Sequence, residues 1–224
     1  MNSSKPRIVL LHATPVAMDP VQDSMKRLWA DAEPINLLDD GLTIDRAKDG
    51  SVLSQELIER FVDLGRYAQQ SVKADGILIT CSAFGPAIDR LSNELSIPVV
   101  KPNEAMFEDA ISAGGRIGML ATFAPAVSTM TQEFEDFVRT SHSSASLTTI
   151  VAAGAIDALR NGDAETHNRL VAERSQELTG FDAIMLAHFS TSRARAAVQE
   201  RLAIPVLSAP DAAVKRIRSL VERS

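Results

Sequence analysis

Two residues capable of proton transfer occupy corresponding places in the chain. Cys81, the only cysteine, follows the apolar run 76–80, and His188 follows the apolar run 183–187. Each run is followed by a turn that carries hydroxyl groups and then by a helical pattern. A thiol between a strand and a helix lies in the positive field of the helix N-terminus, which favours the thiolate. An imidazole exchanges protons near neutral pH. Cys81 and His188 are therefore candidate catalytic residues.

An internal repeat makes the two positions equivalent. DGILITCSAFGPAIDRLSNELSIPVV aligns without a gap with DAIMLAHFSTSRARAAVQERLAIPVL at a constant offset of 107 residues. The offset pairs Asp75 with Asp182, Cys81 with His188, and Pro98 with Pro205. RIVLLHATP, from Arg7, also resembles RIGMLATFAP, from Arg116. Taken singly, a lone cysteine is most often a small buried hydrophobe and a histidine a satisfied core residue. The repeat favours a function for both.

The elements that position these residues alternate along the chain. Short runs rich in Val, Ile and Leu are separated by longer segments with apolar residues at helical spacing, which predicts a parallel α/β fold. We expect two pseudo-symmetric halves, residues 1–100 and 101–210, each a parallel sheet flanked by helices. The C-terminal helix, 211–224, could pack on the first half or on a partner. Ligands of such sheets bind beyond the carboxyl ends of the strands, so the site is expected between the halves.

The turns after the strands offer groups that could stabilise a carbanion through an adjacent carboxylate or carbonyl. The candidate substrate-binding groups are Ser82, the backbone N–H groups of Ala83 and Phe84, Thr122, Ser190, Thr191 and His12. Helix capping is the ordinary alternative for each hydroxyl. His142 and His167 are expected in loops or at the surface.

Composition excludes several classes of protein. The net charge of −6 disfavours binding to a nucleic-acid backbone. No apolar run approaches the roughly 18 residues that span a bilayer, so no membrane partner is expected. The single cysteine allows no internal disulfide, and no Cys/His cluster has zinc spacing. We expect no metal and a cytoplasmic protein, and we leave open a homodimer or higher homo-oligomer.

Three segments carry a resemblance to a known family. ILITCSAFG, GMLATFAPAVSTM and IMLAHFSTS resemble the aspartate/glutamate/hydantoin racemase superfamily, and the likeness covers nearly the whole chain. The resemblance implies an enzyme without cofactors that binds small carboxylates or related carbonyl compounds between two α/β halves. Cys81 matches the cysteine of the first half, and Thr122 matches a threonine that helps to hold the substrate carboxylate. His188 stands where these racemases carry their second catalytic cysteine.

These observations predict a cofactor-independent racemase or epimerase. It would transfer a proton at the α-carbon of a small acidic amino acid or related carbonyl compound, with Cys81 and His188 as the acid/base pair. Because the second cysteine is missing, two alternatives stay open. One is a one-base decarboxylase or isomerase of a small dicarboxylate, similar to arylmalonate decarboxylase or maleate isomerase. The other is a carboxylate-binding protein without catalytic activity.

Overall fold

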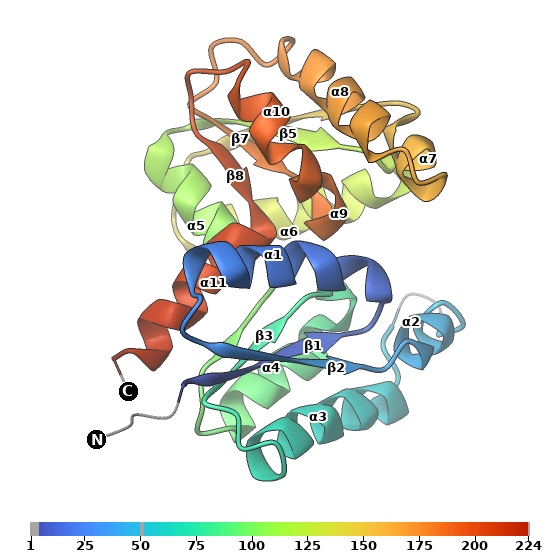
Figure 1. Cartoon of the computed structure of the whole chain (residues 1–224), viewed down its shortest axis with the longest axis vertical. Coiled ribbons are helices and arrows are strands. Elements are labelled where there is room, and N and C mark those ends of the chain that lie inside the picture. Colours follow the sequence, from blue (N-terminus) through green and yellow to red (C-terminus); the bar gives the residue numbers. More distant parts are fainter. Residues whose placement is uncertain (1–4, 50–51, 224) are drawn as a thin grey trace. The chain divides into compact units, whose positions relative to one another are not determined.

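The chain forms two compact units. A computed structural model describes residues 5–49 and 52–223 (Figure 1). Unit 1 takes the described residues of Met1–Asn103 and Ala213–Ser224, and unit 2 is Glu104–Ala212. Each unit contains a parallel sheet with helices on its faces, which confirms the predicted α/β fold class. Within the described ranges, no helix is long and apolar enough to cross a membrane.

Unit 1 is built on a parallel sheet with the strand order β2-β1-β3-β4. Its elements, in chain order, are β1 (Arg7–His12), η1 (Pro15–Ala17), α1 (Met18–Leu28), β2 (Glu33–Leu38), α2 (Gly41–Arg46), α3 (Gln55–Gln70), β3 (Gly76–Ile79), the 3-10 turn η2 (Ser82–Phe84), α4 (Gly85–Glu94) and β4 (Val99–Val100). Helix α3 begins at Gln55 because the Ser54 hydroxyl caps its first turn by accepting from the Leu57 N–H at 3.4 Å.

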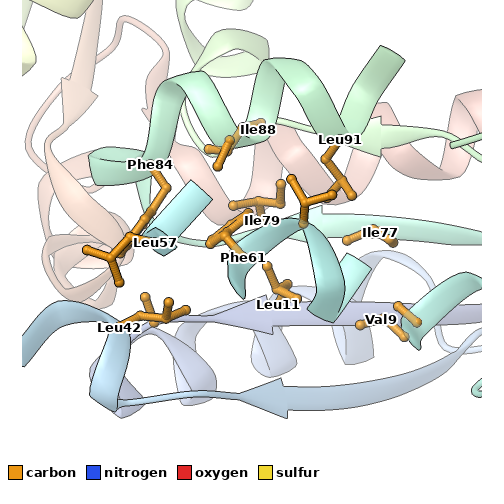
Figure 2. Close-up of a cluster of buried hydrophobic side chains, with 14 of the residues drawn as sticks. Val9, Leu11, Leu42, Leu57, Phe61, Ile77, Ile79, Phe84, Ile88 and Leu91 are labelled. Atoms are coloured by element: carbon orange, nitrogen blue, oxygen red, sulfur yellow. The ribbon is translucent and has the colours of Figure 1, made fainter. Parts of the chain in front are cut away.

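Alternation along β1 and β3 divides the buried side chains between the two faces of the sheet. Figure 2 shows Val9, Leu11, Ile77 and Ile79 of the strands in one cluster with side chains of α3 and α4. Cys81 packs against this cluster. The even-numbered residues of β1 and β3 face the opposite side of the sheet. A Cβ on Gly76 would lie 2.8 Å from Ile217 of the last helix, α11 (Ala209–Val221), so α11 covers that face from Ala213 onward.

Helices α3 and α4 approach each other closely at Gly65. A Cβ at this position would lie 2.2 Å from Leu91 Cδ1, so the contact requires glycine. We expect Gly65→Ala to lower the free energy of unfolding by about 1–3 kcal/mol, because the buried Leu91 side chain or the helices themselves must shift. Urea unfolding of Gly115→Ala is the control, since no atom lies within 4 Å of a Cβ there. Equal effects of the two substitutions would contradict the tight contact.

Unit 2 repeats the arrangement with the strand order β6-β5-β7-β8. Its elements are α5 (Glu104–Ala113), β5 (Arg116–Ala121), η3 (Ala124–Ala126), α6 (Val127–Thr140), β6 (Ser146–Val151), α7 (Ala155–Arg160), α8 (Ala164–Ser175), β7 (Ala183–Leu186), α9 (His188–Thr191), η4 (Ser192–Ala194), α10 (Arg195–Gln199) and β8 (Val206–Ser208), and α11 begins in this unit. Leu120, Ile184 and Leu186 of the sheet pack with apolar residues of α8 and α10. Phe107 of α5 meets Phe134 of α6 edge to face at 5.4 Å.

The internal repeat is visible in individual hydrogen bonds. The Asp75 carboxylate accepts from the Arg7 backbone N–H at 2.7 Å, and Asp182 accepts from Arg116 in the same way at 2.8 Å. The N–H of Ile77 donates to the Pro98 carbonyl at 2.8 Å, and the N–H of Ile184 donates to Pro205 at 2.9 Å. The matched Asp and Pro of the two segments thus have the same structural task in each unit, namely to hold neighbouring strands in register.

Candidate functional site

Cys81 lies directly beyond the carboxyl end of β3, half-buried, with η2 and α4 following it. Ser82 is half-buried and Ala83 is exposed. The ring of Phe84 is fully buried and stacks on Phe61 with centroids 5.0 Å apart, so only the backbone of Phe84 is left for a ligand. The stack fixes the far end of the turn. The backbone N–H groups that open this helical segment give the turn a positive potential suited to an anion or a thiolate.

His12 ends β1 beside this turn and is fully buried. Its Nδ1 lies 2.9 Å from Thr80 Oγ1 and its Nε2 lies 3.0 Å from Asn36 Oδ1. Burial is the main cause that lowers the pKa of His12, so the ring is neutral at pH 7. Both ring nitrogens are thus occupied by protein groups. The structure places this predicted substrate-binding residue next to the Cys81 turn and gives it no nitrogen free for a ligand.

An arginine that the sequence analysis missed lies at the same edge. Arg46, at the end of α2, donates from Nε to the Ala83 carbonyl at 3.4 Å. Helix α2 is held in place by Arg60 of α3, which binds Asp39 with two hydrogen bonds of 2.6 and 2.7 Å and Asp45 with one of 2.9 Å. A guanidinium therefore lies beside the Cys81 turn on a fixed helix. No motif marks Arg46 in the sequence, because its position depends on how α2 packs.

The carboxyl edge of the second sheet carries buried hydroxyls. Thr122 follows β5 and Thr191 ends α9, and their Oγ1 atoms lie 3.3 Å apart. Thr122 is 4% exposed and Thr191 fully buried, while Ser190 is half-buried. The guanidinium of Arg160 lies 5.7 Å from the ring centroid of Phe123, the residue after Thr122, so a positive charge lies near this turn as well. The hydroxyl pair and the cation could together bind an anion.

His188 has an unusual backbone conformation. It begins α9 with φ at 69°, in the left-handed region that a residue with a Cβ rarely adopts. The side chain is half-buried, and burial lowers the pKa of His188, partly offset by a hydrogen bond with the Ala187 backbone. The imidazole is therefore neutral at pH 7 and able to accept a proton. Strained residues of this kind are concentrated at functional sites.

The predicted site residues thus form two sets, one at the carboxyl edge of each sheet. The first set is Cys81, Ser82, Ala83, Phe84 and His12, and the second is Thr122, His188, Ser190 and Thr191. Among the residues that the structure describes, no group of three or more His, Cys, Asp or Glu side chains could hold a metal ion. The chemistry available at these edges is proton transfer by a thiol and an imidazole, supported by hydroxyls, backbone N–H groups and arginines.

A third buried histidine gives the protein a defined pH dependence. His167 of α8 is fully buried, so its predicted surface position is wrong, and its pKa is lowered mainly by burial, as for His12 and His188. Unfolding restores a pKa of about 6.5, so the unfolded chain binds more protons than the folded one below that pH. The contribution of these three histidines to stability is therefore complete above about pH 6.5 and is lost as the pH falls below it.

We expect the urea concentration at the midpoint of unfolding to decrease when the pH is lowered from 7.5 to 5.5. The decrease should be smaller in His167→Leu, because this variant lacks one of the three histidine contributions. His142→Leu is the control, because His142 is exposed. A midpoint independent of pH over this range would contradict the burial of these rings as neutral species.

The comparisons with known proteins identify the family of the chain. Residues 42–179, more than half of the chain, match the sequence profile of a family described as Asp/Glu/Hydantoin racemase. The chain belongs to this racemase family. The match confirms the resemblance on which the sequence analysis relied, and it spans Cys81 and Thr122 but ends before His188.

Solved structures show that the racemase-family chain also shares the fold of several enzymes. Glutamate racemase from Francisella tularensis, solved with D-glutamate, has a TM-score of 0.67 at 15% identity, covering 98% of this chain and 82% of that one. Allantoin racemase from Klebsiella pneumoniae has a TM-score of 0.68 at 16% identity, with coverage of 97% and 88%. Arylmalonate decarboxylase has a TM-score of 0.66 at 17% identity, covering 96% of this chain and 92% of that one. No curated protein matches the sequence.

Proposed function

We propose that the protein is a cofactor-independent racemase or epimerase that moves a proton at the α-carbon of a small acidic amino acid or related carbonyl compound. The observation that carries the proposal is the equivalence of Cys81 and His188. Each follows the third strand of its unit, at positions that the repeat and the strand registers match. Each is a group that can both give and take a proton near pH 7.

Proton exchange with inversion needs one group that removes the α-proton and another that returns a proton to the opposite face. We assign these roles to His188 and Cys81. Because burial lowers its pKa, His188 is the base when the thiol is protonated, and the thiol then donates. In the reverse direction the thiolate is the base and the imidazolium is the acid. No cofactor takes part in either direction.

The carbanion formed in this reaction is stabilised when its charge passes to an adjacent carboxylate or carbonyl oxygen that meets fixed donors. We assign this task to Ser82, to the N–H groups of Ala83 and Phe84, and to Thr122. Arg46 and Arg160, beside the two turns, provide positive charge for an anionic substrate. This donor set supports a small carboxylate as the substrate, and the F. tularensis glutamate racemase that shares the fold was solved with D-glutamate.

A second candidate is decarboxylation of a malonate-type diacid, and the presence of a single cysteine favours it. In that reaction the bond from the α-carbon to one carboxylate breaks, carbon dioxide leaves, and the carbanion takes one proton from the Cys81 thiol. One acid suffices, so His188 would be a positioning or binding group. Arylmalonate decarboxylase shares the fold with this chain.

One experiment separates these functions. The purified protein is incubated in D₂O with aspartate, glutamate, 5-substituted hydantoins and phenylmalonate, and deuterium at the α-carbon and released carbon dioxide are both measured. Deuterium uptake with formation of both stereoisomers supports the racemase. Carbon dioxide release from phenylmalonate alone supports the decarboxylase. Binding of these acids by calorimetry without either reaction would contradict both and leave a binding protein.

A further inference from the structure

A chain of side-chain contacts crosses three strands of the first sheet and ends next to Cys81. Asn36 of β2, His12 of β1 and Thr80, which follows β3, are linked in that order by contacts of 3.0 and 2.9 Å. His12 is fully buried and Thr80 is 6% exposed. The chain thus connects the sheet to the residue that precedes the candidate catalytic thiol.

The Thr80 hydroxyl also reaches the backbone of β1. It lies 3.2 Å from the Leu11 carbonyl, which already accepts the Thr80 N–H at 3.1 Å. Leu11 and Ile79 are the last paired residues of β1 and β3. Thr80 is therefore fixed by its backbone and its side chain beyond the point where the strands stop pairing, and Cys81 is the next residue along the chain.

Counting protons shows that the chain is a closed network. The Thr80 hydroxyl has one proton, which it donates either to His12 Nδ1 or to the Leu11 carbonyl. In the first case Nε2–H donates to the Asn36 carbonyl oxygen. In the second case Nδ1–H donates to Thr80, and the Asn36 amide turns so that its NH₂ group donates to Nε2. A neutral imidazole satisfies both arrangements, so the network needs no outside partner.

The second unit shows that the fold does not require these polar groups. The strand registers place Ala121 at the position of His12 and Ala187 at the position of Thr80, and both alanines are buried. The Ala187 N–H donates to the Leu120 carbonyl at 2.9 Å, as Thr80 does to Leu11. The same backbone pairing therefore forms with small apolar side chains. The polar pair occurs in the unit that carries the cysteine.

We propose that His12 and Thr80 are positioning residues that fix the backbone at the start of the Cys81 turn, and so favour ionisation of the thiol in the positive field of the segment that η2 and α4 form. Neither side chain contacts the substrate in this scheme. The role in catalysis rests on the proposed function of Cys81, whereas the effect on the thiol itself does not. Without the network, the Thr80 N–H still donates to the Leu11 carbonyl, but the side-chain contacts that hold this point of the backbone are lost, and the turn then favours the thiolate less.

The test measures the reactivity of Cys81 without any substrate. Because Cys81 is the only cysteine, its alkylation by iodoacetamide can be followed by intact mass. The quantity compared is the alkylation rate at pH 7 divided by the limiting rate at high pH. This ratio reports the thiolate fraction and is insensitive to a simple change in access. Thr80→Val removes the hydroxyl and keeps the shape of the side chain, whereas Thr80→Ser keeps the hydroxyl.

We expect the ratio to fall about fivefold in Thr80→Val and in His12→Ala, and to remain within about twofold of the wild-type value in Thr80→Ser. Ser175→Ala is the control for general loss of a buried hydroxyl, because Ser175 is fully buried in unit 2 and donates to the Ala172 carbonyl at 2.7 Å. Its ratio should equal that of the wild type. If His12→Ala does not fold, the comparison of Thr80→Val with Thr80→Ser still tests the proposal.

An unchanged ratio in folded Thr80→Val would overturn the proposal, and so would an equal fall in Ser175→Ala. Neither result depends on racemase activity. If the protein exchanges no α-proton but the ratio falls as expected, the proposed function fails and the positioning role stands. If exchange is observed and the ratio does not change, the proposed function stands and the positioning role fails.

Discussion

Cys81→Ala is expected to lower the rate of α-proton exchange in D₂O by about a thousandfold, the middle of the range for loss of a general acid or base. The thiol is assigned one of the two proton transfers. His12, at the same edge, is fully buried with both ring nitrogens in contact with protein groups, so it is not free to take over this proton transfer. Cys81→Ser should lose nearly as much, because a serine hydroxyl is a far weaker acid than a thiol.

The control for this prediction is the stability of the same variants. Cys81 is half-buried against the apolar cluster of unit 1, so its truncation should cost about 1 kcal/mol of unfolding free energy or less. A folded Cys81→Ala protein with wild-type exchange would remove the thiol from the mechanism. Exchange lost together with the cooperative unfolding transition would show only that the variant does not fold, and Cys81→Ser then serves as the variant that retains the volume.

The fold was predictable from sequence because the two central strands of each sheet are short buried runs. β1, β3, β5 and β7 are apolar along most of their length, as expected for parallel strands covered on both faces. The sequence did not predict β2, because its segment EPINLL contains Pro34 and Asn36 and its residues are at most half-buried. It is an edge strand, where proline is tolerated and apolar content is low.

The positions of the candidate site residues in the fold were predictable only where the repeat carried the information. The offset of 107 residues placed Cys81 and His188 at equivalent strand ends, and the sheet registers agree with that pairing. The repeat could not show the contact of Thr80 with His12 or the hydrogen bond of Arg46 to the Ala83 carbonyl, since both join segments far apart in the chain. The burial of His167 was missed for the same reason, because a histidine on a polar helix gives no sign of the face it occupies.

His188→Ala is expected to lower the exchange rate by about a hundredfold or more, since it removes the second group of the acid/base pair. If the enzyme is instead a decarboxylase with one acid, release of carbon dioxide should survive His188→Ala far better than Cys81→Ala does. The ratio of the two losses therefore distinguishes the two candidate functions, measured with the same substrates as the wild-type screen.

The backbone conformation of His188 leads to a separate prediction about stability. With φ at 69°, any residue with a Cβ is strained there by about 1 kcal/mol, and glycine is not. His188→Gly should therefore be more stable than His188→Ala by about 1 kcal/mol in urea unfolding, while both lack exchange activity. The strained conformation would then be retained for what the imidazole does, at the expense of stability.

His142 provides the matched control. Its φ is 54°, but it is exposed in a turn after α6 and belongs to neither set of site residues. His142→Gly should likewise exceed His142→Ala in stability by about 1 kcal/mol, with full exchange activity in both. Equal stabilities of the Gly and Ala variants at residue 188, with a difference at residue 142, would contradict strain at the site. Retained exchange in both residue-188 variants would contradict the acid/base role. If the glycine variants are more stable than the alanine variants at both residues, but activity is lost only at residue 188, then His188 is a strained functional residue and His142 an ordinary residue of a left-handed turn.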